Sequence, residues 1–130
     1  MMKRRLRINF ALEILRSNIQ SIRSVSDWSD MMGWDRAEFS RQFAKMYGEN
    51  AKAAYHRYKL KSIDKFFCAQ PNAKYFEIAY DMGFRDEKAF YDYMRYHTTQ
   101  SPTSYKKKLL ANEASIGVTS RKSIIAKRKL

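Results

Sequence analysis

The sequence of 130 residues contains little that would support a disulfide-bonded, turn-rich or membrane-spanning protein. Its single cysteine, Cys68, excludes an intramolecular disulfide and any metal site with two cysteine ligands. Four glycines and two prolines are too few for a β-sandwich or barrel with a turn about every ten residues. No apolar run approaches the roughly 20 residues that a membrane-spanning helix needs. These absences predict a small, reduced, helical protein of the cell interior.

Acidic residues are also scarce, because 13 Asp and Glu stand against 26 Lys and Arg and leave a net charge of +13. Such a charge attracts polyanions, with nucleic acid as the first candidate and an anionic membrane surface as the second. The charge is uneven: residues 77–92 hold five acids and two bases, whereas residues 106–130 hold eight bases and one acid. We therefore expect a polyanion to bind some parts of the surface and to be repelled by others.

Apolar residues recur at helical spacing along most of the chain, and capping residues, glycines and prolines mark where helices begin and end. Helices are predicted over residues 8–22, from a cap at Ser24 or Ser26 to Gly33, from Asp35 to Gly48, over 50–69 and 73–82, from Asp86 onward, and over 102–110. Residues 111–130 are predicted to form a frayed helix or a flexible basic tail.

One pattern occurs twice: a small residue, a glycine four positions later, and then two large apolar residues four positions apart. At an offset of 50 residues, Trp28, Ser29 and Gly33 correspond to Ile78, Ala79 and Gly83; at an offset of 51, Phe39, Phe43, Gly48 and Ala51 correspond to Phe90, Met94, Thr99 and Pro102. The small residue lets two helices approach closely, and the glycine adopts the turn conformation that a side chain would resist. Each copy predicts a helix-turn-helix whose last helix fits a DNA major groove.

The segment between the two copies has roughly 20 residues, so as a helix it is about 30 Å long. Successive major-groove faces lie about 34 Å apart, and a stiff helix of this length would hold the two helix-turn-helix units on adjacent turns of one duplex. The predicted fold is all-α, with two helix-turn-helix lobes over residues 1–49 and 71–110. A linker helix over 50–70 joins them, and a basic C-terminal tail over 111–130 follows.

Residues 8–108 resemble the DNA-binding domain of AraC/XylS-type transcription regulators. The second copy carries the resemblance in FEIAYDMGFRDEKAFYDYMRYHTTQSPTSYK, through Ile78, Ala79, Gly83, Phe84, Asp86, Phe90, Ser101, Pro102, Tyr105 and Lys106. The first copy, DMMGWDRAEFSRQFAKMYG, matches through Gly33, Phe39, Arg41, Phe43, Lys45 and Gly48. The Lys59-Leu60 pair stands where the linker helix of this family usually has Arg-Leu. The resemblance implies a bilobed helical domain that recognises an asymmetric DNA site with two recognition helices.

By the same resemblance, the base-reading positions fall on Arg36, Ala37, Ser40 and Arg41 in the first lobe and on Glu87, Lys88, Tyr91 and Asp92 in the second. Arg41 is the strongest candidate, because a guanidinium can bond guanine O6 and N7 together. The alternative for Arg41 is a surface ion pair with Glu38. Lys45 and Lys106 are also predicted to contact DNA. Lys106 is the first of three consecutive lysines, Lys106, Lys107 and Lys108, which suit phosphates.

The sequence departs from the family pattern in ways that bear on the second lobe. Ser29 replaces the usual alanine, and Thr99 replaces the usual glycine before the last turn. Asp92 stands where the second lobe often has a basic residue, and Glu87 adds another acid. These two carboxylates either accept from cytosine or adenine amino groups or mark a weak second lobe, and we favour the weak lobe.

The sequence therefore predicts a sequence-specific double-stranded DNA-binding transcription regulator of AraC type, not an enzyme. We expect no catalytic site, metal or cofactor: His56 and His97 lie on different helices without metal-site spacing, and no glycine-rich phosphate loop is present. The partners would be double-stranded DNA and, for an activator, RNA polymerase, with no membrane. A stand-alone chain would be a monomer on DNA in the cytoplasm, at the bacterial nucleoid. Two alternatives remain: a weakly specific architectural DNA-binding protein, or an interaction module that contacts another regulator or RNA polymerase.

Overall fold

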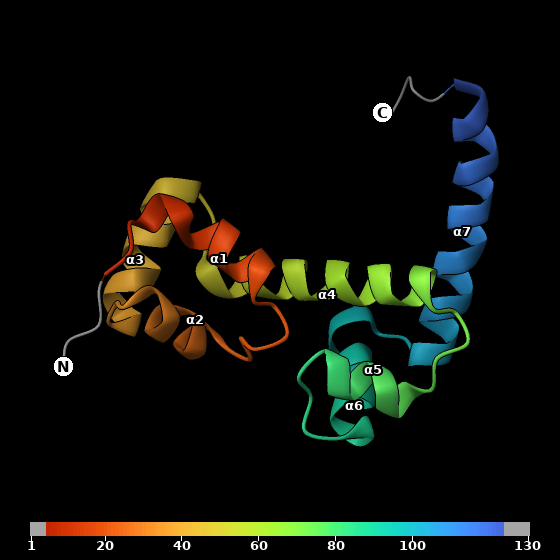
Figure 1. The fold of residues 1–130 in the computed structure, drawn as a ribbon, viewed down its shortest axis with the longest axis horizontal. Coiled ribbons are helices and arrows are strands. Elements are labelled where there is room, and N and C mark those ends of the chain that lie inside the picture. Colours follow the sequence, from red (N-terminus) through yellow and green to blue (C-terminus); the bar gives the residue numbers. More distant parts are fainter. Residues whose placement is uncertain (1–4, 124–130) are drawn as a thin grey trace.

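The computed structural model describes residues 5–123, with side chains as far as Glu113, and all regular structure within this range is helical (Figure 1). The elements in chain order are the 3-10 helix η1 (Ile8–Phe10) and the α-helices α1 (Ala11–Ser17), α2 (Val25–Met32), α3 (Arg36–Tyr47), α4 (Ala51–Ala69), α5 (Tyr75–Asp81), α6 (Glu87–Thr98) and α7 (Pro102–Ser123). The all-α prediction is confirmed.

Two separate hydrophobic cores lie along α4, one at each of its ends (Figure 1). In the first, the fully buried Trp28 meets Phe39 and Phe43 edge-on, with ring centroids 5.0 and 5.1 Å away. In the second, Phe67 and Phe90 are fully buried, 6.4 Å apart. α4 supplies Ala51, Ala54 and Tyr55 to the first core and Ile63 and Phe67 to the second. The helix is therefore part of both lobes as well as the connection between them.

The sequence repeat is a repeat of packing and of backbone conformation. The corresponding residues Trp28 and Ile78 are both buried. Gly33 and Gly83 both have φ +79°, which a side chain disfavours, and each lies in the turn of its helix-turn-helix, after α2 and after α5. At the next corresponding pair the two lobes differ chemically, because Gly48 has φ +74° and Thr99 has φ +60°. Thr99 is the one non-glycine residue with positive φ in the part of the chain described.

Two helix ends differ from the predictions. The helix expected over 8–22 ends at Ser17, where the Asn18 side chain donates to the Ile14 carbonyl over 2.8 Å and competes with the next helical turn. The helix expected over 102–110 continues to Ser123, since nothing between Leu110 and Gly117 breaks it. The last seven residues of the predicted tail, 124–130, lie outside the described residues. Of the two proposed caps of α2, Ser24 is the one that accepts from the Asp27 amide, over 3.1 Å.

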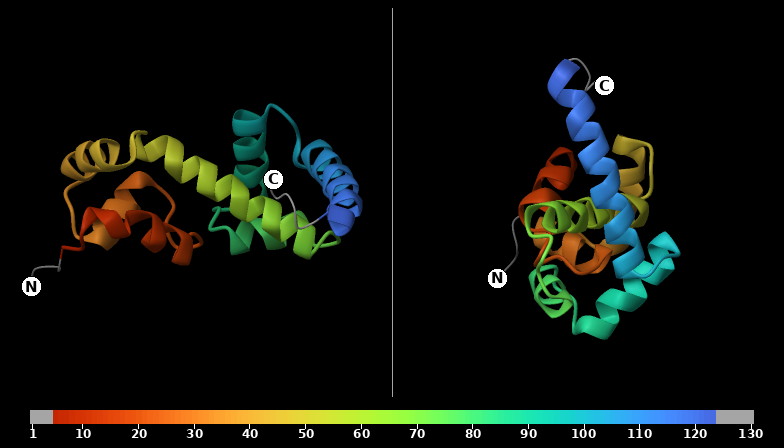
Figure 2. Two further views of the ribbon diagram at one scale, coloured as in Figure 1. Left: turned by 90° about the horizontal axis from the view of Figure 1, so that it is seen from above. Right: turned by 90° about the vertical axis from the view of Figure 1, so that its right-hand side faces the viewer.

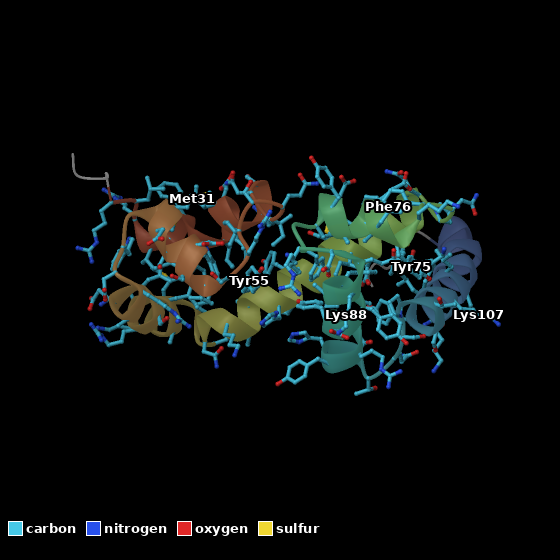
Figure 3. All side chains as sticks on the ribbon, turned by 90° about the horizontal axis from the view of Figure 1, so that it is seen from below. Met31, Tyr55, Tyr75, Phe76, Lys88 and Lys107 are labelled. Carbon is cyan, nitrogen blue, oxygen red and sulfur yellow. The ribbon has the colours of Figure 1, made fainter. Side chains whose placement is uncertain are left out.

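The helices are arranged so that α3 and α6 lie on the same side of α4, while α1, α2 and α5 lie on the opposite side (Figure 2). The view from below agrees, with Lys88 of α6 on one side of the molecule and Phe76 of α5 on the other (Figure 3). We call the side that carries α3 and α6 the α3/α6 face. α7 leads away from the far end of α4, and no helix within residues 5–123 is both long and apolar enough to cross a membrane.

Candidate nucleic-acid interface

In the first lobe, α3 is anchored on one side and exposed on the other. Asp35 caps the helix by accepting from the amides of Ala37 and Glu38, over 3.1 and 3.2 Å. Phe39 and Phe43 are fully buried and fix the inner side of the helix on the first core. The predicted contact residues of this lobe all lie on the remaining surface of α3, with Ser40 half-buried and the others exposed: Arg36, Ala37, Ser40, Arg41 and Lys45.

The Arg41 side chain makes an ion pair with Glu38, one turn earlier on α3. Glu38 also accepts from the Gln42 side chain over 3.1 Å, and hydrogen bonds from Arg41 and then Gln42 lower the pKa of the Glu38 carboxyl. The Arg41 side chain remains 67% exposed. An ion pair this exposed contributes little stability, so the guanidinium can exchange its carboxylate for a base or a phosphate at small cost.

In the second lobe, α6 has the same construction but a different charge. Asp86 caps it by accepting from the Ala89 amide over 2.8 Å, and this bond lowers the pKa of the Asp86 carboxyl. The predicted contact residues of this lobe are all exposed: Glu87, Lys88, Tyr91 and Asp92. Lys88 donates to Asp92 over 2.9 Å, which raises the pKa of the lysine. The pair leaves α6 without the excess of positive charge that α3 presents.

Lys106 lies apart from these two sets. Its ammonium donates to the Pro71 carbonyl and lies 6.0 and 5.9 Å from the ring centroids of Phe67 and Tyr75. The half-buried side chain therefore links the second turn of α7 to the loop after α4. The structure brings together the predicted residues of α3 and those of α6 on one face, and it places Lys106 within the packing of the second lobe.

A groove of about 730 Å³ between α3 and α6 brings two predicted contact residues together with residues that the sequence did not identify as a site. Its polar side chains include Arg36 and Ser40 of α3, Lys52 and His56 of α4, and Tyr96 and His97 of α6, and Val25 of α2 also lines it. From the sequence, Lys52, His56, Tyr96 and His97 could be placed only on their own helices, whereas Arg36 and Ser40 were already predicted contacts. No cluster of metal-ligating residues occurs within residues 5–123.

The two histidines, which are far apart in the chain, are in contact in this groove. Their ring centroids are 4.2 Å apart, and His56 Nδ1 shares a 2.9 Å hydrogen bond with the Tyr93 hydroxyl. Burial is the main cause that lowers the pKa of His56 to about 4, followed by the charges of His97, Lys52 and Lys59. Burial and then the charge of Lys52 lower the pKa of His97 as well. Both imidazoles are therefore neutral at pH 7, and both lie near the Lys52 ammonium.

The second lobe is held against α4 and the first lobe by two further contacts. Lys59, only 2% exposed, donates from Nζ to the Met82 carbonyl over 2.7 Å, and burial lowers the pKa of its ammonium to about 8. At the next residue, a Cβ built on Gly83 would lie 2.5 Å from the Gln20 carbonyl oxygen of the first lobe. The two lobes therefore touch directly at the turn between α5 and α6.

Comparisons with known proteins agree with this geometry. A family model described as a helix-turn-helix domain matches residues 28–108. A transcriptional regulator from Chromobacterium violaceum with an AraC-type DNA-binding domain has a similar structure, with a TM-score of 0.61, 20% identity, and coverage of 78% of this chain and 90% of that one. The DNA-binding domain of AdpA, a global transcriptional factor solved with a target DNA, gives a TM-score of 0.65, 16% identity, and coverage of 82% and 96%. A search of curated protein sequences finds no significant match.

Proposed function

The chain belongs to the AraC-type helix-turn-helix family, and from this premise we propose that it is a sequence-specific regulator of transcription that binds double-stranded DNA. In this proposal α3 and α6 enter two adjacent major grooves. The solved AdpA domain, which has a similar fold, is in complex with its target DNA. We further propose that a stand-alone chain acts as a monomer on DNA, in the cytoplasm at the nucleoid.

The observation that carries the proposal is the placement of two equivalent helices on one side of one unbroken helix (Figure 2). α4 has 19 residues, so it is about 28 Å long. This is close to the distance of about 34 Å between successive major-groove faces on one side of a duplex. Helices α3 and α6 on opposite sides of α4, or a break within α4, would have removed this match.

The two lobes are proposed to contribute unequally to binding. The exposed surface of α3 carries Arg36, Arg41 and Lys45, whose charges attract phosphates and whose donors suit guanine. On α6, the Lys88–Asp92 pair cancels its own charge and Glu87 repels the DNA backbone. The first lobe therefore supplies most of the affinity, with Ala37 and Ser40 against the base edges, and α6 supplies the smaller part through Lys88 and Tyr91.

A selection from random duplexes, followed by titration of the selected site, tests the proposal. We expect a two-part motif with its halves about one helical turn apart. Arg41→Ala should weaken specific binding by about 1–3 kcal/mol and relax one base position. Asp92→Ala should change the affinity little, as should Arg16→Ala, a matched loss of an exposed arginine on α1. Equal losses for Arg41→Ala and Asp92→Ala would contradict the unequal lobes. The absence of any motif would favour the architectural DNA-binding protein.

A second candidate function, contact with RNA polymerase or another regulator, is favoured by a groove along α5, where Phe76 lies on the side of the molecule opposite Lys88 (Figure 3). Phe76 is 59% exposed and Tyr80 is 84% exposed there, and Glu77 and Asp81 accompany them. The carboxylates repel DNA, and the exposed aromatic side chains beside them suit contact with another protein. The double variant Phe76→Ser/Tyr80→Ser should keep DNA affinity and lose transcription activation. Unchanged activation would remove this function.

A further inference from the structure

We infer that the groove between α3 and α6 seats the DNA backbone between the two half-sites, with Lys52 as its phosphate contact. The inference rests on the proposed function and adds to it a binding site outside both recognition helices. Its ligand is the phosphodiester backbone, so its contribution to binding is independent of base sequence.

The position of the groove supports this ligand. A protein that reads two successive major grooves from one side of a duplex also faces the minor groove between them and the two phosphate strands that border it. The surface between α3 and α6 therefore meets phosphates before it meets base edges. The groove is this surface, since its lining comes mostly from α3, from the first turns of α4 and from the last turn of α6.

The charge of the groove fits a phosphate strand. No carboxylate lines it, and its cations are Arg36 and Lys52. Two other exposed bases of α3 and α4 are paired with acids, Arg41 with Glu38 and Arg57 with Glu49. The exposed Lys52 ammonium makes no ion pair within the described residues, so no carboxylate has to be displaced before it meets a phosphate.

The surroundings of Lys52 show that its charge acts inside the groove. The Lys52 ammonium is near enough to both His56 and His97 to lower the pKa of each. Tyr96, 82% exposed, stands beside them at the edge of the groove and can donate its hydroxyl to a second phosphate. The groove therefore offers an ammonium to one phosphate and a phenol to the next, beside neutral imidazoles and without a competing negative charge.

The experiment compares Lys52→Ala with Lys65→Ala in the full chain. Both lysines are exposed on α4 and both changes remove one positive charge, so the long-range electrostatic loss is matched. Thirteen residues separate them, which places them roughly 140° apart around the helix. Lys65 lines a different hollow with Arg16 and Ile19. A difference between the two variants therefore reports a local contact.

The affinity of each variant for the selected two-part duplex is measured between about 50 and 200 mM salt. Lys52→Ala should reduce the log–log salt slope by about 0.9, the value for one phosphate, without changing the selected motif. Lys65→Ala should leave the slope as in the wild type. If both variants have the wild-type slope, or both lose the same amount, the groove holds no phosphate and the inference is overturned. Failure of the wild type to select any motif would instead overturn the proposed function.

Discussion

Replacing Gly83 with alanine tests whether contact between the lobes, in addition to α4, sets the spacing of the two recognition helices. Gly83 lies in the turn between α5 and α6 with φ +79°, and its added Cβ would lie 2.5 Å from the Gln20 carbonyl oxygen and 3.3 Å from Arg23 Nε. Gly48 is the matched control, because it has a similar φ of +74° but nothing within 4 Å of its added Cβ. The two variants share the backbone strain, and only Gly83→Ala adds a clash.

The magnitudes follow from these two contributions. A left-handed conformation costs a residue with a side chain about 1–2 kcal/mol, so Gly48→Ala should lower the free energy of unfolding by this amount. A Cβ at 2.5 Å from a backbone oxygen requires the α5–α6 turn or the Gln20 loop to move by several tenths of an ångström or more. Overpacking of this kind costs about 1–3 kcal/mol. Gly83→Ala should therefore lower the free energy of unfolding by about 2–5 kcal/mol.

Chemical denaturation measures the stabilities, and DNA titration measures the consequence for spacing. Gly83→Ala should lose affinity for the two-part site about tenfold, with little change for the isolated first half-site, because two linked contacts need matched geometry. Titrations are made at a temperature where both variants remain folded. Equal destabilisation by Gly83→Ala and Gly48→Ala would refute the lobe contact. An unchanged ratio of two-part to half-site affinity would show that α4 alone sets the spacing.

The remaining predictions concern stability. Thr99→Gly should raise the free energy of unfolding by about 0.5–1 kcal/mol, because it removes about 1–2 kcal/mol of left-handed strain but also increases the entropy of the unfolded chain. A thermal melt should show a Tm higher by a few degrees. No gain would mean that the φ of +60° is unstrained at this position. Acid should destabilise the wild type more than His56→Gln. Burial lowers the pKa of His56 from 6.5 to about 4, so its contribution is complete above pH 6.5 and is lost as the pH falls toward 4. The wild type should lose about 1–2 kcal/mol of unfolding free energy more than His56→Gln, after allowance for the partial exposure of His56, and denaturation curves at pH 7 and about pH 4.5 measure this difference. Parallel pH profiles of the two proteins would contradict the lowered pKa of His56.

Local features of the sequence determined the helices, their order and most of the residues in the two cores. Helical periodicity and caps depend on neighbours within about four residues, so Asp35 and Asp86 could be assigned as caps from the sequence, and each caps its helix in the structure. The repeat also predicted the turn conformation of Gly33 and Gly83, which both have positive φ, whereas the positive φ of Thr99 was not predicted. The contact residues on α3 and α6 stay predictions. The structure shows how exposed each of them is and which of them form ion pairs, and neither observation identifies a ligand.

Contacts between distant segments could only be decided by the tertiary structure. Lys106 was one of three similar lysines in the sequence, and packing alone directs its ammonium to Pro71. The groove that joins Lys52 to His97 exists because the last turn of α6 meets α4 at His56, and the approach of Gly83 to Gln20 depends on how both lobes pack on that helix. Such contacts arise from the summed packing of many side chains, and no spacing within a single helix encodes them. The sequence by itself determined two helix-turn-helix units joined by one long helix, with an excess of positive charge on the last helix of the first unit and none on that of the second. The tertiary structure decided their common face and the surface between them.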